Sequence, residues 1–131
     1  MINLLLWLWQ LPQNLLGLIL LLIYRYRYLW LEDRGRLYFV CVDFPSGISL
    51  GRYIILKRED SSNTYNHEFG HSIQSRYLGP LYLIVIGLPS LLGNIWDRLF
   101  HRGWSWRERE WWYYHQPWES WADRLGGVNR F

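Results

Sequence analysis

The sequence contains a single cysteine and a single lysine, and each shortage excludes a class of interaction. With Cys41 alone, no disulfide can form within the chain and no cysteine cluster can hold a metal ion. Apart from Lys57, the positive charge is carried by thirteen arginines, with no basic run interleaved with an RNA-binding motif. Nucleic acid is therefore not expected as a partner. The length of 131 residues allows one domain with a modest core and indicates no particular oligomeric state.

Charge is also missing from the start of the chain, where no charged residue occurs before Arg25. The apolar run Ile2–Tyr24 is long enough to cross a hydrocarbon core of about 30 Å, and it lacks the basic start and the cleavage site of a signal peptide. Ten Trp and ten Tyr suit the headgroup level of a bilayer. We therefore expect a membrane helix over residues 1–30, with the lipid bilayer as a partner.

Polar residues interrupt the middle of this run: Gln10, Gln13 and Asn14, with Pro12 among them. Such side chains are costly in lipid and usually face protein or a wet cavity. Two interpretations are open. The run is either two shorter interfacial segments joined at Gln10–Pro12, or one helix whose polar band packs under an active site.

Basic residues follow the run at positions 25, 27, 34 and 36, and none precedes it. By the positive-inside rule, this places the bulk of the chain in the cytoplasm. Next, Leu37–Asp43 and Ile48–Leu56 are rich in β-branched and aromatic residues, and the turn signal Phe44–Gly47 lies between them. They predict a short β-hairpin, followed by a polar loop over Lys57–Asn63.

The string HEFGH, His67 to His71, carries the strongest chemical signal. In a helix, residues four apart lie on one face, so the two histidines can share one Zn²⁺. Glu68 stands beside the first histidine, where it can act as general base on a zinc-bound water. Gly70 leaves room for a second element to approach. The competing interpretation is a helix with two histidines that bind no metal.

A catalytic zinc needs a third protein ligand. The pattern with a later histidine fails because Tyr77 stands in its place. Within QPWESWADRLGG, residues 116–127, Pro117 and Gly126 suit the two ends of a helix that carries Glu119 and Asp123 on one face. Glu119 can bind the metal, and Asp123 can orient a ligand histidine. The competing interpretation is a solvated face on which Asp123 pairs with Arg124 or Arg107.

HEFGH followed by a helix with Glu-x-x-x-Asp resembles the gluzincin branch of the zincin metallopeptidases. The resemblance implies that His67, His71 and Glu119 hold zinc, that Glu68 is the base and that Asp123 supports a histidine. It covers the two helices and the preceding strand. Longer strings, such as GISLGRYIIL and HEFGHSIQSRYLGPLYL, resemble small bacterial membrane-associated proteins with HEFGH or HEYGH. That resemblance implies a bacterial inner membrane as the location.

The gluzincin resemblance leaves two parts of a peptidase site to be assigned. No residue clearly matches the family's oxyanion-stabilising His or Tyr, and the candidates are Tyr113, Tyr114 and His115, with aromatic packing as the alternative for each. In the zincin arrangement, the strand before the HEFGH helix is an edge strand that can hold an extended peptide by main-chain hydrogen bonds. Its accessible end would comprise Ser46, Gly47, Ile48, Ser49 and Leu50.

A second apolar stretch, Leu81–Leu92, is broken by Gly87 and Pro89 and is short for a straight span. A single crossing there would put Glu119 across the membrane from the histidines. We therefore expect a re-entrant or interfacial helix, the alternative being a zinc site at membrane depth. Intramembrane metalloproteases resemble the chain in their H-E-x-x-H, but their Leu-Asp-Gly ligand string matches only weakly at Ala122–Gly126.

Together these features predict an α+β, mostly helical protein. It would comprise an N-terminal transmembrane helix, a short β-hairpin, the H-E-x-x-H helix, a re-entrant or interfacial helix and a C-terminal ligand helix. Residues 1–30 would form the membrane helix and residues 31–131 a minimal zincin-like metal-binding domain. The predicted function is a membrane-anchored zinc peptidase that acts on a peptide or a membrane-proximal protein segment. The alternatives are a non-catalytic protein stapled by zinc and a metal-free membrane scaffold.

Overall fold

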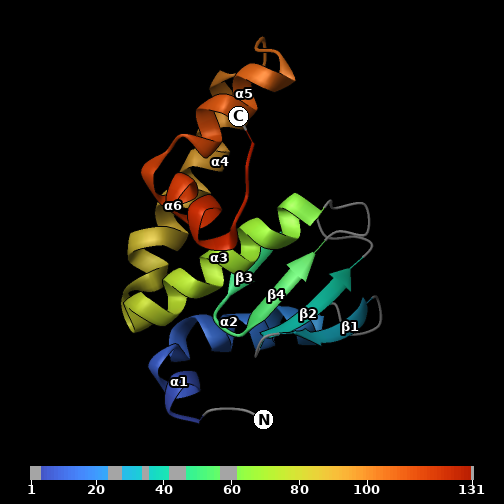
Figure 1. Ribbon diagram of the computed structural model, residues 1–131, viewed down its shortest axis with the longest axis vertical. Helices are drawn as coiled ribbons and strands as arrows, with labels where there is room; N and C mark the ends of the chain where they lie inside the picture. The colour runs from blue at the N-terminus through green and yellow to red at the C-terminus, as the bar shows by residue number, and fades with distance from the viewer. Residues whose placement is uncertain (1–3, 24–27, 34–35, 42–46, 57–61, 131) are drawn as a thin grey trace.

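The computed structural model describes residues 4–23, 28–33, 36–41, 47–56 and 62–130, and it is α+β and mostly helical (Figure 1). The elements are α1 (Leu4–Trp9), α2 (Leu11–Ile23), β1 (Tyr28–Asp33), β2 (Arg36–Cys41), β3 (Ile48–Leu50), β4 (Tyr53–Leu56), α3 (Ser62–Leu78), the 3₁₀ turn η1 (Gly79–Leu81), the π-helical turn η2 (Leu83–Gly87), α4 (Leu88–Phe100), α5 (Trp106–Tyr114) and α6 (Pro117–Gly126).

The four described strands form one sheet in the order β1-β2-β4-β3. The β1/β2 and β3/β4 pairs are antiparallel, whereas β2 and β4 are parallel. A hairpin between Leu37–Asp43 and Ile48–Leu56 was therefore the wrong pairing. The second run folds back on itself instead, because Gly51 has a positive φ of 65° and forms a two-residue turn with Arg52. The predicted loop over 57–63 lies mostly outside the described residues, and α3 already includes its last two positions.

Strand β4 is buried on both faces, and its alternating side chains separate two cores. Tyr53 and Ile55 pack with apolar residues of α2, whereas Ile54 and Leu56 pack with Phe69 of α3. The sheet therefore lies between α2 and α3, as Figure 1 shows. In this layer order, the HEFGH helix α3 packs on the sheet with one side and against α6 with the other.

The continuous N-terminal transmembrane helix is not supported. The apolar run forms two helices, α1 and α2, that meet at Gln10. The break has a reason in the polar band, because Gln13 donates hydrogen bonds to Ser75 Oγ and the Gly79 carbonyl, both at 2.8 Å. Ser75 in turn donates to Gln10 Oε1 at 2.7 Å, and the three side chains are buried. The band thus packs against the end of α3, one turn beyond His71.

The second apolar stretch continues from η1 through η2 into α4 without a break at Gly87 or Pro89. Pro89 is accommodated in the first turn of α4. Leu83–Phe100 is the one helix in the described part of the chain that is long and apolar enough to cross a membrane. It has 18 residues, a mean hydropathy of 1.3 and 6% of its residues buried. This statement rests on the length and composition of the helix only, and core helices of some soluble proteins are equally long and apolar.

Candidate metal centre

Helices α3 and α6 cross in close contact, and two glycines make the contact possible. A Cβ on Gly70 would overlap the carbonyl group of Ala122, and a Cβ on Gly126 would overlap the carbonyl group of Asn66. The room expected at Gly70 is therefore filled by α6. The helix end differs by one residue from the prediction, since Gly127, with φ 73°, is the left-handed cap, whereas Gly126 serves the crossing.

The crossing brings His67, His71 and Glu119 together as a buried group that could hold a metal ion. Glu119 Oε2 lies 2.9 Å from His67 Nε2 and 3.0 Å from His71 Nε2. Around a tetrahedral ion with bonds near 2.1 Å, such atoms would lie about 3.4 Å apart. Each of these two pairs would therefore have to separate by about half an ångström to admit the ion.

The hydrogen bonds of the two Nδ1 atoms, on the side of each ring away from Glu119, fix the tautomers of His67 and His71. His67 Nδ1 lies 2.6 Å from Asp123 Oδ1, and His71 Nδ1 lies 2.7 Å from Gln74 Oε1. Gln74 Nε2 donates to the Trp118 carbonyl at 2.9 Å, so its oxygen faces the ring as an acceptor. Both Nδ1 atoms therefore carry a proton, and in its neutral form each ring would turn an Nε2 lone pair towards Glu119. Three lone-pair donors then face one point, an arrangement that requires either protons or a cation.

Without a metal, protons meet this requirement. Burial alone would lower the pKa of His67, but the hydrogen bonds to Asp123 and Glu119 outweigh it and raise the pKa to about 9. Burial likewise opposes the charged form of His71, yet the charge of Glu119 raises its pKa overall. The two histidines hold the pKa of the Glu119 carboxyl well below its usual range, despite its burial. The buried group of His67, His71 and Glu119 thus stabilises a positive charge placed between its three side chains.

The other oxygen of Glu119 is held by α4. Ser90 Oγ donates a short hydrogen bond to Glu119 Oε1, and the Tyr113 hydroxyl lies 3.2 Å from Ser90 Oγ. Oε1 is therefore engaged, which leaves Oε2 to face the histidines. The apolar helix α4 is in this way tied directly to the metal centre.

A cleft of about 480 Å³ opens beside the cluster, and both His67 and Glu68 line it. Gly47 lies at the same place, since a Cβ there would touch Glu68 Cγ at 3.3 Å. Glu68 is 7% exposed, so its carboxylate is shielded but still borders the cleft. The base predicted from the motif thus lies where a substrate could approach the cluster.

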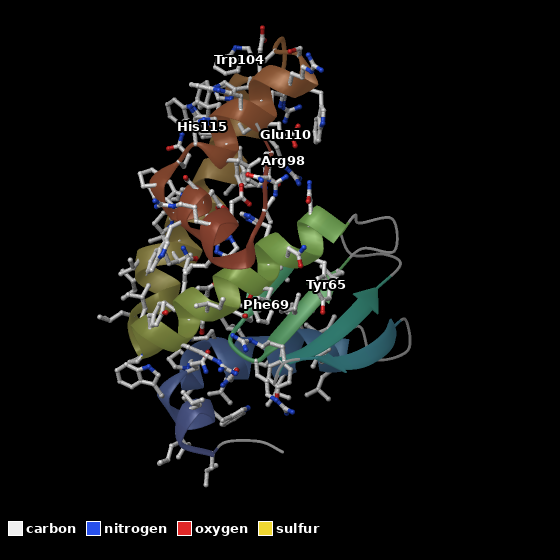
Figure 2. All side chains as sticks on the ribbon, in the orientation of Figure 1. Tyr65, Phe69, Arg98, Trp104, Glu110 and His115 are labelled. Carbon is white, nitrogen blue, oxygen red and sulfur yellow. The ribbon has the colours of Figure 1, made fainter. Side chains whose placement is uncertain are left out.

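Two of the three candidate oxyanion donors line the cleft. Tyr113 and Tyr114 are both part of its wall, and the Tyr114 ring meets the His67 ring edge-on at 5.1 Å. Burial raises the pKa of both phenols, so they stay protonated hydrogen-bond donors. His115 is exposed, its Nδ1 lies 2.6 Å from the Trp111 carbonyl, and Figure 2 shows it away from α3. The structure does not bring His115 to the site.

The run predicted as a single edge strand divides into β3, at the edge of the described sheet, and β4, which lies between β2 and β3. Among the described residues predicted to hold substrate, only the one just before β3 borders the cleft. Ser46 lies outside the described residues, Gly47 lines the cleft and Ile48 is half-buried. Ser49 and Leu50 are buried, and the Tyr82 hydroxyl donates to the Ser49 carbonyl at 3.0 Å. A peptide could therefore pair with the edge near Gly47, whereas the Ser49 carbonyl is already engaged.

Three supporting residues were missed in the sequence. Ser90 holds Glu119, Gln74 orients His71, and Arg130 donates to Asp123 Oδ2 at 2.8 Å. Asp123 thus pairs with Arg130, and not with Arg124 or Arg107. Burial alone would raise the pKa of Asp123, but His67 and Arg130 outweigh it and lower the pKa. Gln74 could have been found, since it stands three residues after His71 on the same helix. No spacing rule indicates Ser90 or Arg130.

Comparisons with known proteins add no relative. No protein-family model, curated protein or solved structure matches the chain.

Proposed function

We propose that the chain is a membrane-associated zinc metallopeptidase of the gluzincin type. The observation that supports this most directly is the convergence of two imidazole lone pairs and one carboxylate oxygen on a single point, next to a glutamate in a cleft. Hydrogen bonds that the two Nδ1–H groups donate to Asp123 and Gln74 hold both rings in the tautomer that metal binding needs.

The donor set favours zinc over calcium and magnesium. Two imidazoles and one carboxylate match the three protein ligands of a catalytic zinc, with one position left for water or substrate. Calcium and magnesium prefer ligand sets made of oxygen atoms. A structural zinc usually has four protein ligands, and among the described residues the cluster has three.

The chain's own residues suit the hydrolysis of an amide bond. A zinc ion in such a centre supplies a Lewis acid that polarises a carbonyl and makes water more acidic. Glu68 would take the proton from the attacking water and deliver it to the leaving amine. Tyr114, held in the protonated form by burial, could donate a hydrogen bond to the oxyanion that develops on the carbonyl. The Tyr113 proton is directed to Ser90 Oγ, since Ser90 donates its own proton to Glu119.

Exposed apolar side chains support membrane association. They gather on α1–α2 and along η2–α4, and the larger ones include Leu5, Leu8, Ile19, Leu22, Ile23, Ile84, Leu88, Leu91, Leu92 and Phe100. Contiguous apolar surface on this scale is rare on a soluble monomer and suits a bilayer. The cytoplasmic side of a bacterial inner membrane, and a division of the chain near residue 30, stay predictions.

Metal content is the decisive test. The chain, purified in mild detergent, should hold one zinc per molecule by elemental analysis, and Glu119→Ala should lose it or bind it far more weakly. Glu68→Gln should keep the zinc but lose cleavage of a peptide library. Zinc that is retained alongside unchanged cleavage in Glu68→Gln would contradict the assigned base. A wild-type chain that takes up no zinc after reconstitution would favour the metal-free scaffold.

A further inference from the structure

The cleft beside the metal centre is lined by opposite charges, which come from four parts of the chain. Arginines at 98, 109 and 130 face it together with the acids Glu68, Asp97 and Glu110. Most of these charges are matched within the protein. The question is which one is left for a ligand.

Two of the three arginines are engaged. Asp97 Oδ2 accepts two hydrogen bonds from Arg109, at 3.1 Å and 2.7 Å. Arg130 donates to Asp123, lies 3.6 Å from Glu110 and stacks over the Tyr114 ring at 3.5 Å. These guanidinium groups shape the wall of the cleft, and their charge is already neutralised.

Arg98 differs from both. Within the described part of the chain, its side chain makes no ion pair or hydrogen bond, although Asp97 is its neighbour in sequence. Asp97 is taken by Arg109 and by His101, whose Nδ1 lies 2.9 Å away. Arg98 is exposed and borders the cleft, and Figure 2 places it where α4 and α5 meet, towards the cleft residue Glu110.

Arg98 is the one arginine of the cleft that none of the described carboxylates contacts. With a divalent ion bound, Glu119 and Glu68 would lie next to the ion, Asp97 would remain with Arg109, and Glu110 and Asp123 would remain with Arg130. A guanidinium group carries a planar fork of donors that binds a carboxylate with two parallel hydrogen bonds. The cleft volume of about 480 Å³ falls within the range of ligand sites and can hold a short peptide.

We propose that Arg98 binds a carboxylate of the peptide substrate, and so makes the enzyme selective for acidic or C-terminal peptide segments. The inference rests on the proposed function and adds a substrate class to it. The carboxylate can come from the C-terminus of the peptide or from an acidic side chain. Both sources offer the same chemistry to the guanidinium group.

Binding to a variant that cannot turn over provides the test. Glu68→Gln protein, with its zinc content measured in the same sample, is titrated by calorimetry with three N-acetylated peptides. These are tetra-alanine with a free C-terminus, its C-terminal amide, and the amide with one alanine replaced by glutamate. We expect one carboxylate peptide to bind about tenfold more tightly than the plain amide. Which of the two does so identifies the source.

The same titrations are repeated with Arg98→Gln, Arg98→Lys and Arg102→Gln added to Glu68→Gln. Arg102 is the matched control, because it is exposed one turn further along and does not line the cleft. Arg98→Gln should abolish the preference for carboxylate, Arg98→Lys should keep part of it, and Arg102→Gln should leave it intact.

Two results would overturn the proposal. One is a carboxylate preference that survives in Arg98→Gln, because the metal or another cation would then be the receptor. The other is equal binding of all three peptides. Failure of the proposed function is distinct, because it would appear as absent zinc in the same samples. In that case, peptide binding by the metal-free protein with and without Arg98→Gln would still show whether Arg98 binds the carboxylate.

Discussion

At the scale of the residue, the protonation of His67 links the stability of the metal-free protein to pH. Its pKa is about 9 in the folded chain and 6.5 ordinarily, because the bonds to Asp123 and Glu119 outweigh burial. Such a group stabilises the fold fully below about pH 6.5, and this contribution is lost as pH rises through 9. The carboxyls of Glu119 and Asp123 have lowered pKa values, so their contribution is lost as pH falls below about 4.

Chelator-treated protein should therefore have its highest Tm in mildly acidic buffer, between about pH 5 and 6.5, and lose roughly 5 °C or more by pH 9. Zinc should reverse the trend, because it requires both histidines to be neutral. The Tm of the zinc-loaded protein should rise from pH 5 to 7.5. Thermal melts across this range, with and without chelator, check both slopes. Parallel curves would show that these histidines do not bind the metal.

Ser90 should act on zinc affinity through Glu119. Removing its hydroxyl in Ser90→Ala frees Glu119 Oε1 to rotate, and the loss of such a partner costs about 10- to 100-fold in metal affinity. Ser90→Thr keeps the hydroxyl and should restore most of the affinity. Ser120→Ala, on α6 beside Glu119 in sequence, is the control. Competition with a chromophoric chelator measures the affinities, and equal values for all the variants would exclude the role.

At the scale of the element, the metal centre depends on how closely α3 and α6 cross. Gly70→Ala would place a methyl group against the Ala122 carbonyl and separate the helices. Overpacking of this kind costs about 1–3 kcal/mol or more, and it should also move Glu119 away from the histidines. We expect lower stability in denaturant titrations together with reduced zinc content.

Gly93→Ala is the matched control for this change. Gly93 lies inside α4, and a Cβ there meets nothing within 4 Å. Alanine in a helix interior is favoured over glycine by about 1 kcal/mol, so this variant should be neutral or more stable and should keep its zinc. If both variants behaved alike, the close crossing would not determine the geometry of the centre.

The elements differ in how far the sequence predicts them. The ligands on α3 and α6 were predictable because spacing of four residues is a local property of a helix. The strand pairing was not, because it depends on a turn at Gly51 within a run, Ile48–Leu56, that reads as one strand. Contacts such as Ser90 with Glu119, or Arg130 with Asp123, join segments whose approach follows only from the packed fold.

At the scale of the whole molecule, two apolar surfaces lie on the helices around the candidate metal centre. One lies on α1–α2 and the other on η2–α4, and the Trp9 ring of α1 packs against Gly79 in η1, the turn that precedes η2. The buried polar band of α2 faces inwards to α3, so the outward side of these helices is left almost purely apolar. This division of polar and apolar sides suits a protein that meets lipid along one flank while its cleft stays accessible to water.

Charges placed on these surfaces should weaken membrane binding. Leu88 and Leu92 are 48% and 55% exposed, and Ile19 and Ile23 are 51% and 67% exposed. Leu88→Asp with Leu92→Asp, or Ile19→Asp with Ile23→Asp, should each reduce flotation with phosphatidylcholine vesicles by about tenfold or more, since a buried aliphatic side chain contributes about 1.5–3 kcal/mol. Arg107→Glu changes the net charge equally on an exposed face of α5 and should float like the wild type. A wild-type chain that stays soluble and monomeric without detergent, and does not float, would show that neither surface contacts lipid.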